Sequence, residues 1–271
     1  MAGLWWVNAF VGPDAGGNAT CVVMETDQGS AIDRAGVARA LRAPDTTFVA
    51  PGARPDEWRV RFFSPDEGEM AFCGQALIAT DAVLRAVGAS APRVPLRLST
   101  MAGPVSTRAD ESSGLTWFTS PRALIQRRAG GALAPLVGGA PAPVVVDSGR
   151  QRLFQRLERA DDIEGVRLEP DEVLRLCDRH DVKGVCFYAQ AGAAGIALRV
   201  FTVSLAGRED ASTGGAVLAL CALLPQGLWT IAQGRGRYLG RGALMLDSAS
   251  SNDEVSVGGR VELVARGGLA G

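Results

Sequence analysis

The chain has 271 residues, of which 47% are hydrophobic and 21% are charged, and its formal net charge is -1. This size and composition are typical of a globular protein with room for two packed lobes. There is no basic excess, which argues against a nucleic-acid partner. No apolar run reaches the ~18–20 residues that a membrane helix requires. Residues 1–10 lack the features of a signal peptide, so we expect a cytoplasmic protein with no membrane partner.

The range of catalytic side chains is narrow. Five cysteines are scattered along the chain without a CxxC pair, and His180, in a polar stretch that favours the surface, is the only histidine. These residues predict neither a disulfide framework nor a metal site. They also exclude a catalytic pair built on histidine within an internal repeat. A catalyst made from this chain must therefore use carboxylates, cysteine, hydroxyls and backbone amides.

The first half of the chain predicts mostly strands. Ser30, followed three residues later by Asp33, resembles a helix cap and predicts a short helix over 32–41. Apolar and β-branched runs predict strands over 4–11, 20–24, 57–63, 96–99, 105–108 and 115–118. A second helix, over 74–87, is apolar on all sides except at Thr80 and Asp81. Such a helix should be buried on nearly every face, as a rod inside a wrapping sheet would be.

The second half of the chain repeats this order of elements. A strand, a turn and a glycine precede the helix at 74–87, and the same signals precede a second apolar helix over 214–224. A short helix is expected over 172–178, with strands over 143–146, 153–157, 185–188, 196–201, 229–233, 243–246, 254–257 and 261–264. Self-similarity at half the chain length predicts an α+β fold with two pseudo-symmetric lobes, each a sheet wrapped around a buried helix.

We expect the N-terminal lobe to span residues 1–120 and the C-terminal lobe 143–259. The linker between them is the stretch 121–142, which is rich in Ala, Gly, Pro and Arg. The C-terminal strand near 260–271 is a candidate to join the first lobe. In a two-lobed protein the cleft between the lobes is the natural place for a small-molecule site.

Each central helix begins at a glycine, Gly74 in the first lobe and Gly214 in the second. The first turn of a helix carries free N–H groups and the positive end of the helix dipole, so it can bind an anion. A glycine there lets a ligand approach the backbone closely. Two such helix starts facing one cleft would hold a carboxylate. An alternative, which the sequence supports equally well, is that both glycines only permit tight packing of the helices against the sheets.

Three polar side chains lie next to these helix starts. Asp210 precedes Gly214 by four residues and could cap the helix or act on substrate, and spacing favours the cap. Asp45 follows Pro44 between a helix and a strand, a common place for a turn aspartate. Cys73 directly precedes the first central helix, where the dipole would lower the pKa of the thiol. A buried, inert cysteine is the favoured alternative.

Five stretches, in order along the chain, resemble the phenazine-biosynthesis PhzF family of the diaminopimelate epimerase-like fold. The first two are Val7-Asn8-Ala9-Phe10 with Gly17-Asn18-Ala19 (family pattern D-x-F … G-N-P) and Asp45-Thr46-Thr47-Phe48-Val49 (S-E-S/T-x-F-V). The others are Arg61-Phe62-Phe63-Ser64-Pro65 with Cys73-Gly74-Gln75-Ala76 (R-x-F-T-P … G-H-A/P), Glu209-Asp210-Ala211-Ser212-Thr213-Gly214-Gly215-Ala216 (E-D-x-x-T-G-S-A), and Gln233-Gly234 with Gly240-Arg241 (Q-G … G-R). Each match alone is weak, and together they are specific.

The resemblance implies proton transfer without a cofactor. In the family a glutamate shuttles the proton, helped by a histidine, an aspartate and a serine. Carried over by position, it implies catalytic roles for Asp45, Gln75 and Asp210, while Gly215 stands at the serine position. Asp45 is still a carboxylate but is one methylene shorter. Gln75 can form hydrogen bonds but cannot usefully exchange a proton at pH 7, and Gly215 offers only a backbone N–H and more room.

We therefore expect a PhzF-like isomerase with Asp45 as the proton shuttle. Its substrate would be a small unsaturated or cyclic carboxylic or amino acid in secondary-metabolite biosynthesis. The resemblance further implies a homodimer that needs no cofactor and no metal. The expected substrate-binding residues are Asn18, Cys73, Gly74, Thr213, Gly214 and Gly215.

Two alternatives remain open on the sequence. The replaced histidine and serine also fit a protein of this fold that binds a small molecule without catalysis. Related epimerases and racemases place one cysteine in each half of the chain. Here Thr213 stands where the second cysteine would be, so a site with one thiol and one hydroxyl would be a Cys73-dependent epimerase or dehydratase.

Overall fold

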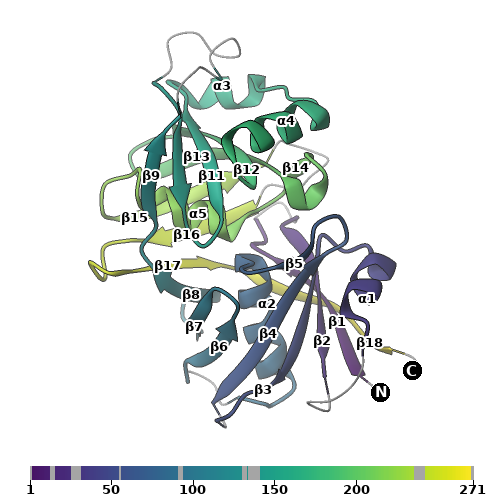
Figure 1. Cartoon of the computed structure of the whole chain (residues 1–271). Coiled ribbons are helices and arrows are strands. Elements are labelled where there is room, and N and C mark those ends of the chain that lie inside the picture. Colours follow the sequence, from purple (N-terminus) through teal and green to yellow (C-terminus); the bar gives the residue numbers. More distant parts are fainter. Residues whose placement is uncertain are drawn as a thin grey trace.

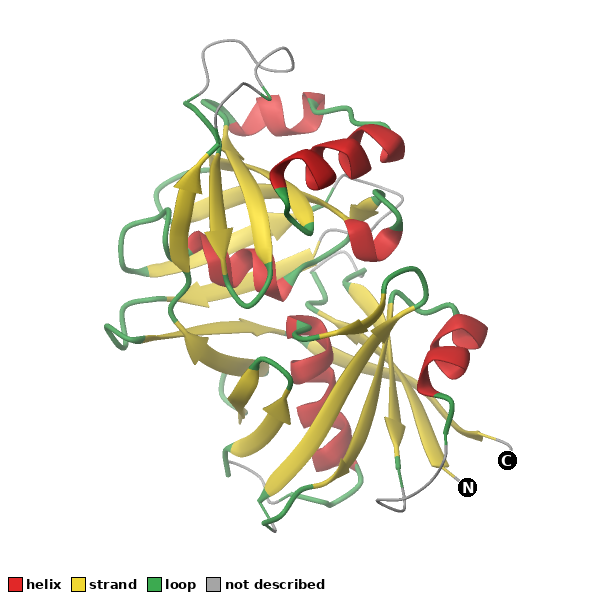
Figure 2. Ribbon diagram, viewed as in Figure 1, coloured by secondary structure: helices red, strands yellow, loops and turns green. Residues whose placement is uncertain are grey.

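The structure is a computed structural model that describes residues 2–12, 16–25, 32–54, 56–90, 94–129, 133, 141–234 and 242–269. Two lobes lie one above the other (Figure 1), and in each a curved sheet wraps around one central helix (Figure 2). The strands of both lobes form one continuous hydrogen-bonded sheet. This arrangement confirms the predicted α+β fold.

The first half of the chain contributes nine strands and two helices to the described structure. The strands are β1 (Ala2–Ala9), β2 (Asn18–Met24), β3 (Asp45–Pro51), β4 (Glu57–Ser64), β5 (Gly68–Met70), β6 (Leu96–Thr100), β7 (Gly103–Asp110), β8 (Leu115–Pro121) and β9 (Leu124–Arg128). The helices are α1 (Arg34–Leu41) and the central helix α2 (Gly74–Ala86).

The second half follows the same plan with a longer helical insertion. Its strands are β10 (Val144–Asp147), β11 (Gln151–Arg156), β12 (Gly184–Gln190), β13 (Gly195–Thr202), β14 (Glu209–Asp210), β15 (Leu228–Gln233), β16 (Gly242–Asp247), β17 (Glu254–Gly259) and β18 (Val261–Leu269). Its helices are α3 (Ala160–Gly165), α4 (Pro170–His180) and the central helix α5 (Gly214–Leu220), with a 3₁₀ turn at Val203–Leu205.

Strand pairing repeats between the two halves. In the first half β2–β3 is parallel, β3–β4 antiparallel and β4–β6 parallel. The second half has the same order: β11–β12 is parallel, β12–β13 antiparallel and β13–β15 parallel. The lobes join where β8 pairs with β17. Each half also gives its last strand to the other lobe, because β9 pairs with β10 and β18 pairs with β1.

The same ion pair braces the approach to each central helix. Arg61 on β4 forms two hydrogen bonds of 2.6 Å with Glu69 on β5. Arg199 on β13 forms two with Glu209 on β14, at 2.7 and 2.6 Å. Two parallel N–H···O bonds fix the geometry of an arginine and a carboxylate. Each pair therefore fixes the short strand that leads the chain into its central helix.

Helix α2 is buried along ten of its thirteen residues, as its apolar sequence predicts. Its two polar exceptions are satisfied inside the protein. Thr80 donates to the carbonyl of Ala76 at 2.7 Å. Asp81 accepts from Arg85 at 2.6 Å and from Thr107 at 2.7 Å. Because buried polar groups are costly only when unpaired, these two do not disturb the core.

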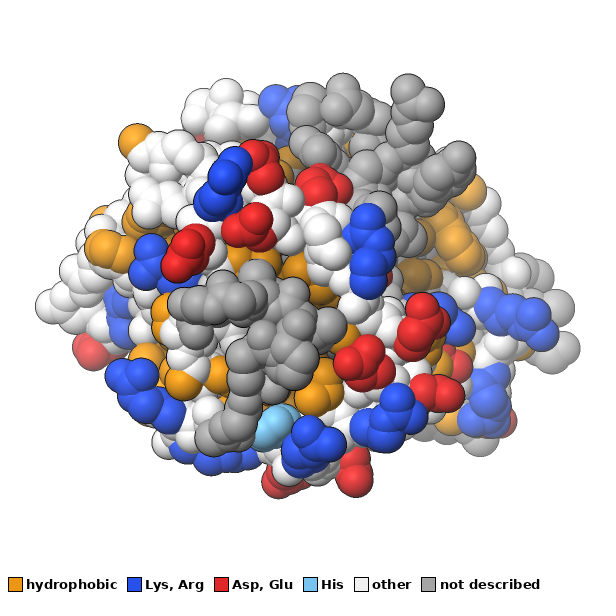
Figure 3. Space-filling view, turned by 90° about the horizontal axis from the view of Figure 1, so that it is seen from above, with side chains coloured by type: hydrophobic (Ala, Val, Ile, Leu, Met, Phe, Trp, Pro, Cys, Tyr) orange, Lys and Arg blue, Asp and Glu red, His pale blue; other side chains and the backbone are white. Residues whose placement is uncertain are grey.

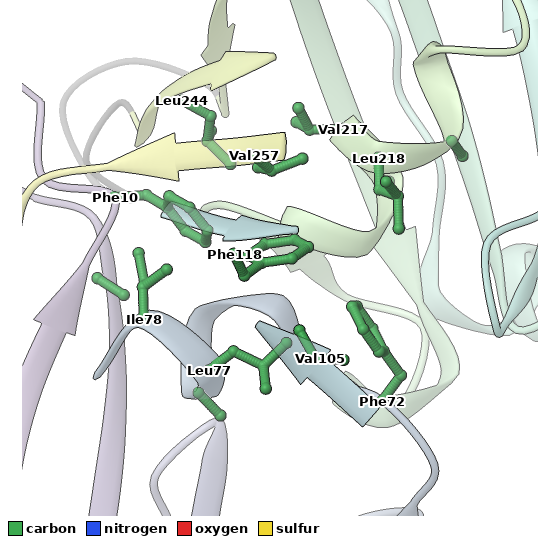
Figure 4. Packing of buried hydrophobic residues seen from close by; sticks show 14 of the residues in the cluster. Phe10, Phe72, Leu77, Ile78, Val105, Phe118, Val217, Leu218, Leu244 and Val257 are labelled. Atoms are coloured by element: carbon green, nitrogen blue, oxygen red, sulfur yellow. The ribbon is translucent and has the colours of Figure 1, made fainter. Parts of the chain in front are cut away.

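The two central helices meet at their N-termini. A Cβ built on Gly74 would lie 2.9 Å from the Cα of Gly214, and one built on Gly214 would lie 3.0 Å from the Cα of Gly74. The ring of Phe118 packs against both glycines, and Phe10 packs against Gly214. Figure 4 shows these two rings among the buried hydrophobic residues. The packing role of the glycines is thus present in the structure, because side chains at these positions would force the helices apart.

Some details differ from the sequence expectations. Helix α1 begins at Arg34 and is capped by Asp33, whose carboxylate accepts from the backbone N–H of Gly36 at 2.8 Å. The expected cap, Ser30, lies outside the described residues. Helix α3, which the sequence analysis missed, packs against β12 and β13. The stretch expected as a linker, 121–142, contains β9.

The described surface mixes charges of both signs. Figure 3 looks down on the second lobe, where acidic and basic side chains are interspersed around apolar patches. Within the described residues, no helix is both long and apolar enough to cross a membrane.

We predict that Gly74→Ala destabilises the protein by about 1–3 kcal/mol, because overpacking at the helix contact costs this much. The melting temperature should fall by several degrees in differential scanning calorimetry. Gly267→Ala is the matched control, since a Cβ there meets nothing within 4 Å. Equal melting temperatures for the two variants would contradict the packing role of Gly74.

Candidate active site between the lobes

A small cavity lies where the two central helices begin. Its free volume is about 30 Å³, which is roughly the space of one water molecule. The first lobe contributes Asp45, Met70, Phe72, Cys73, Gly74 and Gln75 to the lining; the second contributes Arg150, Arg152, Thr202, Ser204, Asp210, Thr213, Gly214 and Gly215. The structure thus brings most of the sequence-predicted site residues together at the lobe interface.

Asp45 begins β3 and is buried at the cavity. One carboxylate oxygen, Oδ2, accepts a hydrogen bond from the thiol of Cys73 at 3.3 Å. Burial raises the pKa of Asp45 from 3.8 to about 7, and the negative charge of Asp210 adds to the increase. Near neutral pH this carboxyl can therefore both accept and release a proton.

Asp210 lies opposite, at the end of β14. It accepts hydrogen bonds from Asn18 at 2.5 Å and from the hydroxyl of Thr213 at 2.6 Å. Burial raises the pKa of Asp210 to about 6, and these two hydrogen bonds limit the increase. The spacing of four residues between Asp210 and Gly214 favoured a helix cap. The carboxylate instead binds side chains that line or border the cavity.

Asn18 connects the two lobes beneath the cavity. Its amide nitrogen lies 2.6 Å from Oε1 of Gln75, 2.5 Å from Oδ1 of Asp210 and 2.8 Å from the carbonyl of Ser212. Gln75 in turn donates to the carbonyl of Ala19 at 3.3 Å. Asn18 borders the cavity without being among its lining residues. The amide of Gln75 is therefore held in a fixed orientation by first-lobe atoms.

Gln233 binds two residues that line the cavity on the second-lobe side. The sequence identified it only as part of a motif. Its Oε1 accepts from the backbone N–H of Thr213 at 2.9 Å. Its Nε2 donates to the hydroxyl of Thr213 at 2.8 Å and to the carbonyl of Asp210 at 3.1 Å. This buried amide fixes both residues. The companion motif residues Gly240 and Arg241 lie outside the described residues.

Cys73 is the N-cap residue of α2, as its place in the sequence indicates. The sequence left two possibilities, a thiol whose pKa is lowered by the helix dipole and an inert cysteine, and favoured the inert one; the raised pKa agrees with it. Burial and the neighbouring charge of Asp45 raise the pKa of Cys73 well above 9.0. The thiol is therefore protonated at neutral pH and donates to Asp45 rather than acting as a thiolate.

The turn between β4 and β5 binds residues of the second lobe, two of which line the cavity. Ser64 donates to the carbonyl of Ser204 at 2.7 Å. Arg150 bonds to Glu67 at 2.6 Å, and Arg208 reaches Asp66 at 3.2 Å. None of these contacts was expected from the sequence, because each joins residues far apart in the chain. With so little free volume, the site must open at this turn or elsewhere to admit a substrate.

The site is built from carboxylates, amides, hydroxyls, a thiol and two arginines, with no histidine in its lining. His180 ends α4, away from the cavity. Among the described residues, no group of three or more His, Cys, Asp or Glu side chains could hold a metal ion. The chemistry that these groups support directly is proton transfer at the two buried carboxylates.

Comparison with known proteins agrees with this fold. The profile of the PhzC-PhzF family, described as phenazine biosynthesis-like proteins, matches residues 7–267. The chain therefore belongs to this family. A Deinococcus radiodurans protein named an uncharacterized isomerase is 31% identical over 291 residues, covering 97% of this chain and 90% of that protein.

Solved structures show the same fold. A PhzF-family protein from Enterococcus faecalis superposes with a TM-score of 0.81 at 21% identity, over 98% of each chain. A hydroxyproline epimerase from Agrobacterium vitis, solved with bound trans-4-hydroxy-L-proline, gives 0.66 at 15% identity, over 98% of this chain and 91% of that one. The diaminopimelate epimerase-like fold implied by the sequence motifs is thus confirmed.

The raised pKa of Asp45 predicts an unusual pH dependence of stability. The folded state holds the proton up to pH 7, whereas the unfolded chain releases it near 3.8. The folded state thus binds more protons between these values, and stability falls as pH rises through them. In urea melts, Asp45→Asn should be more stable than wild type at pH 8 by a few kcal/mol, at about 1.4 kcal/mol per pKa unit. The difference should disappear near pH 4.

Asp110→Asn is a control of opposite sign. Hydrogen bonds from Ser112 and Ser113 lower the pKa of this exposed carboxyl to about 2. Its contribution to stability is present above its unfolded pKa and is lost in acid, so this variant should be less stable than wild type at pH 8. If Asp45→Asn behaved in the same way, the pKa of Asp45 would not be raised.

Proposed function

We propose that this protein, an isomerase like its Deinococcus radiodurans relative, moves a proton between two carbons of a small carboxylic acid with Asp45 as the shuttle. The ionised carboxylate of Asp45 would take a proton from a carbon near the substrate carboxyl group. It would then return that proton to a second carbon of the same molecule. The step is balanced, since no oxidant, cofactor or second substrate takes part.

The observation that carries the proposal is the buried pair of carboxylates with displaced pKa values. Asp45 titrates near pH 7 and Asp210 near pH 6. A general acid–base works best when its pKa lies near the working pH. Both carboxyls line one small cavity, one from each lobe. Asp210, fixed by Asn18 and Thr213, is suited to hold the substrate while Asp45 exchanges the proton.

The cavity supports a carboxylated substrate. The first N–H groups of α2 and α5, at Gly74, Gly214 and Gly215, lie at its wall, and such groups favour an anion. Fixed donors of this kind also stabilise negative charge that develops during deprotonation. The related fold that holds trans-4-hydroxy-L-proline supports a small cyclic amino acid or unsaturated analogue as the substrate class. A homodimer and a role in secondary-metabolite biosynthesis remain part of the proposal.

The direct test is proton NMR in D₂O with a panel of small cyclic and unsaturated amino acids. We expect deuterium to enter one carbon of the substrate. Asp45→Asn should slow this exchange by about 10²–10⁴-fold, the usual contribution of a general acid–base group. The rate should rise with pH up to about 7 and then level off, because the ionised form removes the proton.

Cys73→Ser is the matched control at the neighbouring position. It should exchange within a few-fold of wild type, because a hydroxyl can replace the thiol as the donor to Asp45. Turnover by Asp45→Asn at the wild-type rate would reject the shuttle. A compound that is bound by wild type without exchange at any carbon would favour the non-catalytic alternative.

A separate prediction concerns thiol chemistry at Cys73. Because its pKa is raised well above 9.0, this thiol should react with iodoacetamide much more slowly at pH 7 than a free thiol such as glutathione. Mass spectrometry of the labelled peptide would measure the rate. Rapid alkylation with loss of exchange activity would instead support the Cys73-dependent epimerase or dehydratase.

A further inference from the structure

One buried cation in the site has no ionic partner. Arg152 lies on β11, and only 5% of the residue is exposed. Its Nη1 donates to the hydroxyl of Ser148 at 3.4 Å and to the carbonyl of Arg150 at 3.2 Å. Its Nε has no hydrogen-bond partner. Within the described part of the chain, Arg152 forms no ion pair.

The other buried arginines of this lobe are paired. Arg150 bonds to Glu67 at 2.6 Å, and Arg199 bonds to Glu209 at 2.6 Å. Arg152 differs from them: the charges of Asp210 and Glu67 act on it, but neither carboxylate forms an ion pair with it. A buried charge without a direct partner is unfavourable. Burial and the charge of Arg150 lower the pKa of Arg152 to about 10, so the guanidinium is still charged at neutral pH.

The guanidinium lies beside the start of α5, at the wall of the cavity that Asp45 and Asp210 share. A Cβ built on Gly215 would lie 3.2 Å from Nη2 and 3.3 Å from Nη1 of Arg152. The Gly215 backbone thus packs against the guanidinium, and a side chain at this position would crowd both terminal nitrogens. Arg152 and Gly215 both line the cavity, so a side chain at residue 215 would narrow the approach to this planar, double hydrogen-bond donor.

We propose that Arg152 binds the carboxylate of the substrate, and that Gly215 gives this carboxylate access to the guanidinium. The proposal rests on the proposed function in assuming that the bound acid is isomerised. The binding of a negatively charged group to Arg152 does not depend on that assumption. A guanidinium matches a carboxylate with two parallel N–H···O bonds. The site therefore selects free acids, and a neutral amide or ester of the same shape would leave the guanidinium unpaired.

The test uses formate and formamide, the smallest carboxylate and its neutral analogue, because the small cavity has to open least to admit them. At 100 mM and constant ionic strength, formate but not formamide should raise the Tm of the wild type. For a Kd of ~10 mM the shift would be roughly 3 °C. Arg152→Met should lose the formate shift. Arg156→Met, an exposed arginine on the same strand, should keep it.

A second variant keeps the test decisive if Arg152→Met does not fold. Gly215→Ala places a methyl group against the guanidinium and should weaken the formate shift while leaving Arg152 in place. Equal formate shifts in wild type and Arg152→Met would overturn the proposal. So would the absence of a formate-specific shift in the wild type, since an open guanidinium should bind the smallest carboxylate.

Failure of this inference can be told from failure of the proposed function. Asp45→Asn should keep the formate shift, because it removes a nearby negative charge and leaves the guanidinium unchanged. A formate shift that depends on Arg152, with no proton exchange in any compound, would reject the isomerisation and keep the anion site. Proton exchange by Arg152→Met with wild-type KM and kcat would reject the role of Arg152 and keep the isomerisation.

Discussion

The contact between Gly74 and Gly214 is the constraint on which the rest of the structure depends. Because neither residue has a Cβ, the two central helices can begin almost against each other. The residues just before them, Cys73 and Thr213, then lie at one cavity together with the carboxylate from each lobe. The site is thus a product of helix packing. Its polar residues come together because two apolar helices, each enclosed by its own sheet, meet end to end.

Two opposing effects act on the carboxylates at this meeting point: the positive helix ends favour their charged form, and burial disfavours it. Two helix N-termini with positive dipole ends would repel each other if nothing negative lay between them. Asp45 and Asp210 supply that negative charge; the charge of Arg150 acts on Asp45, and that of Arg152 acts on Asp210. Burial nevertheless dominates, because both carboxyl pKa values are raised and not lowered. The protein thus keeps carboxyl groups that change protonation near neutral pH without a histidine.

The sequence predicted the parts of this structure that are encoded locally. The helices at 74–87 and 214–224 were visible because they are apolar on all sides, and Asp45, Gln75 and Asp210 were found through motifs. Arg152 was missed because its strand was expected to start at residue 153, whereas β11 begins at Gln151; the alternation with Phe154 could have placed it on the inner face. The helix dipole at Cys73 can be inferred from the local sequence, whereas the burial and the charge of Asp45, which raise the pKa of the thiol, come from the folded structure.

The exchange of the last strands has a consequence for how the molecule holds together. Each half gives one strand to the other lobe, β9 to β10 and β18 to β1, so neither lobe is complete with its own half of the chain. Halves that exchange strands in this way cannot separate as two independent bodies. Unfolding of one half also removes a strand from the sheet of the other lobe. Any opening between the lobes must therefore leave β8 paired with β17 and each exchanged strand paired in the other lobe, or else break these pairings. The topology therefore links folding cooperativity to the range of motion available at the site.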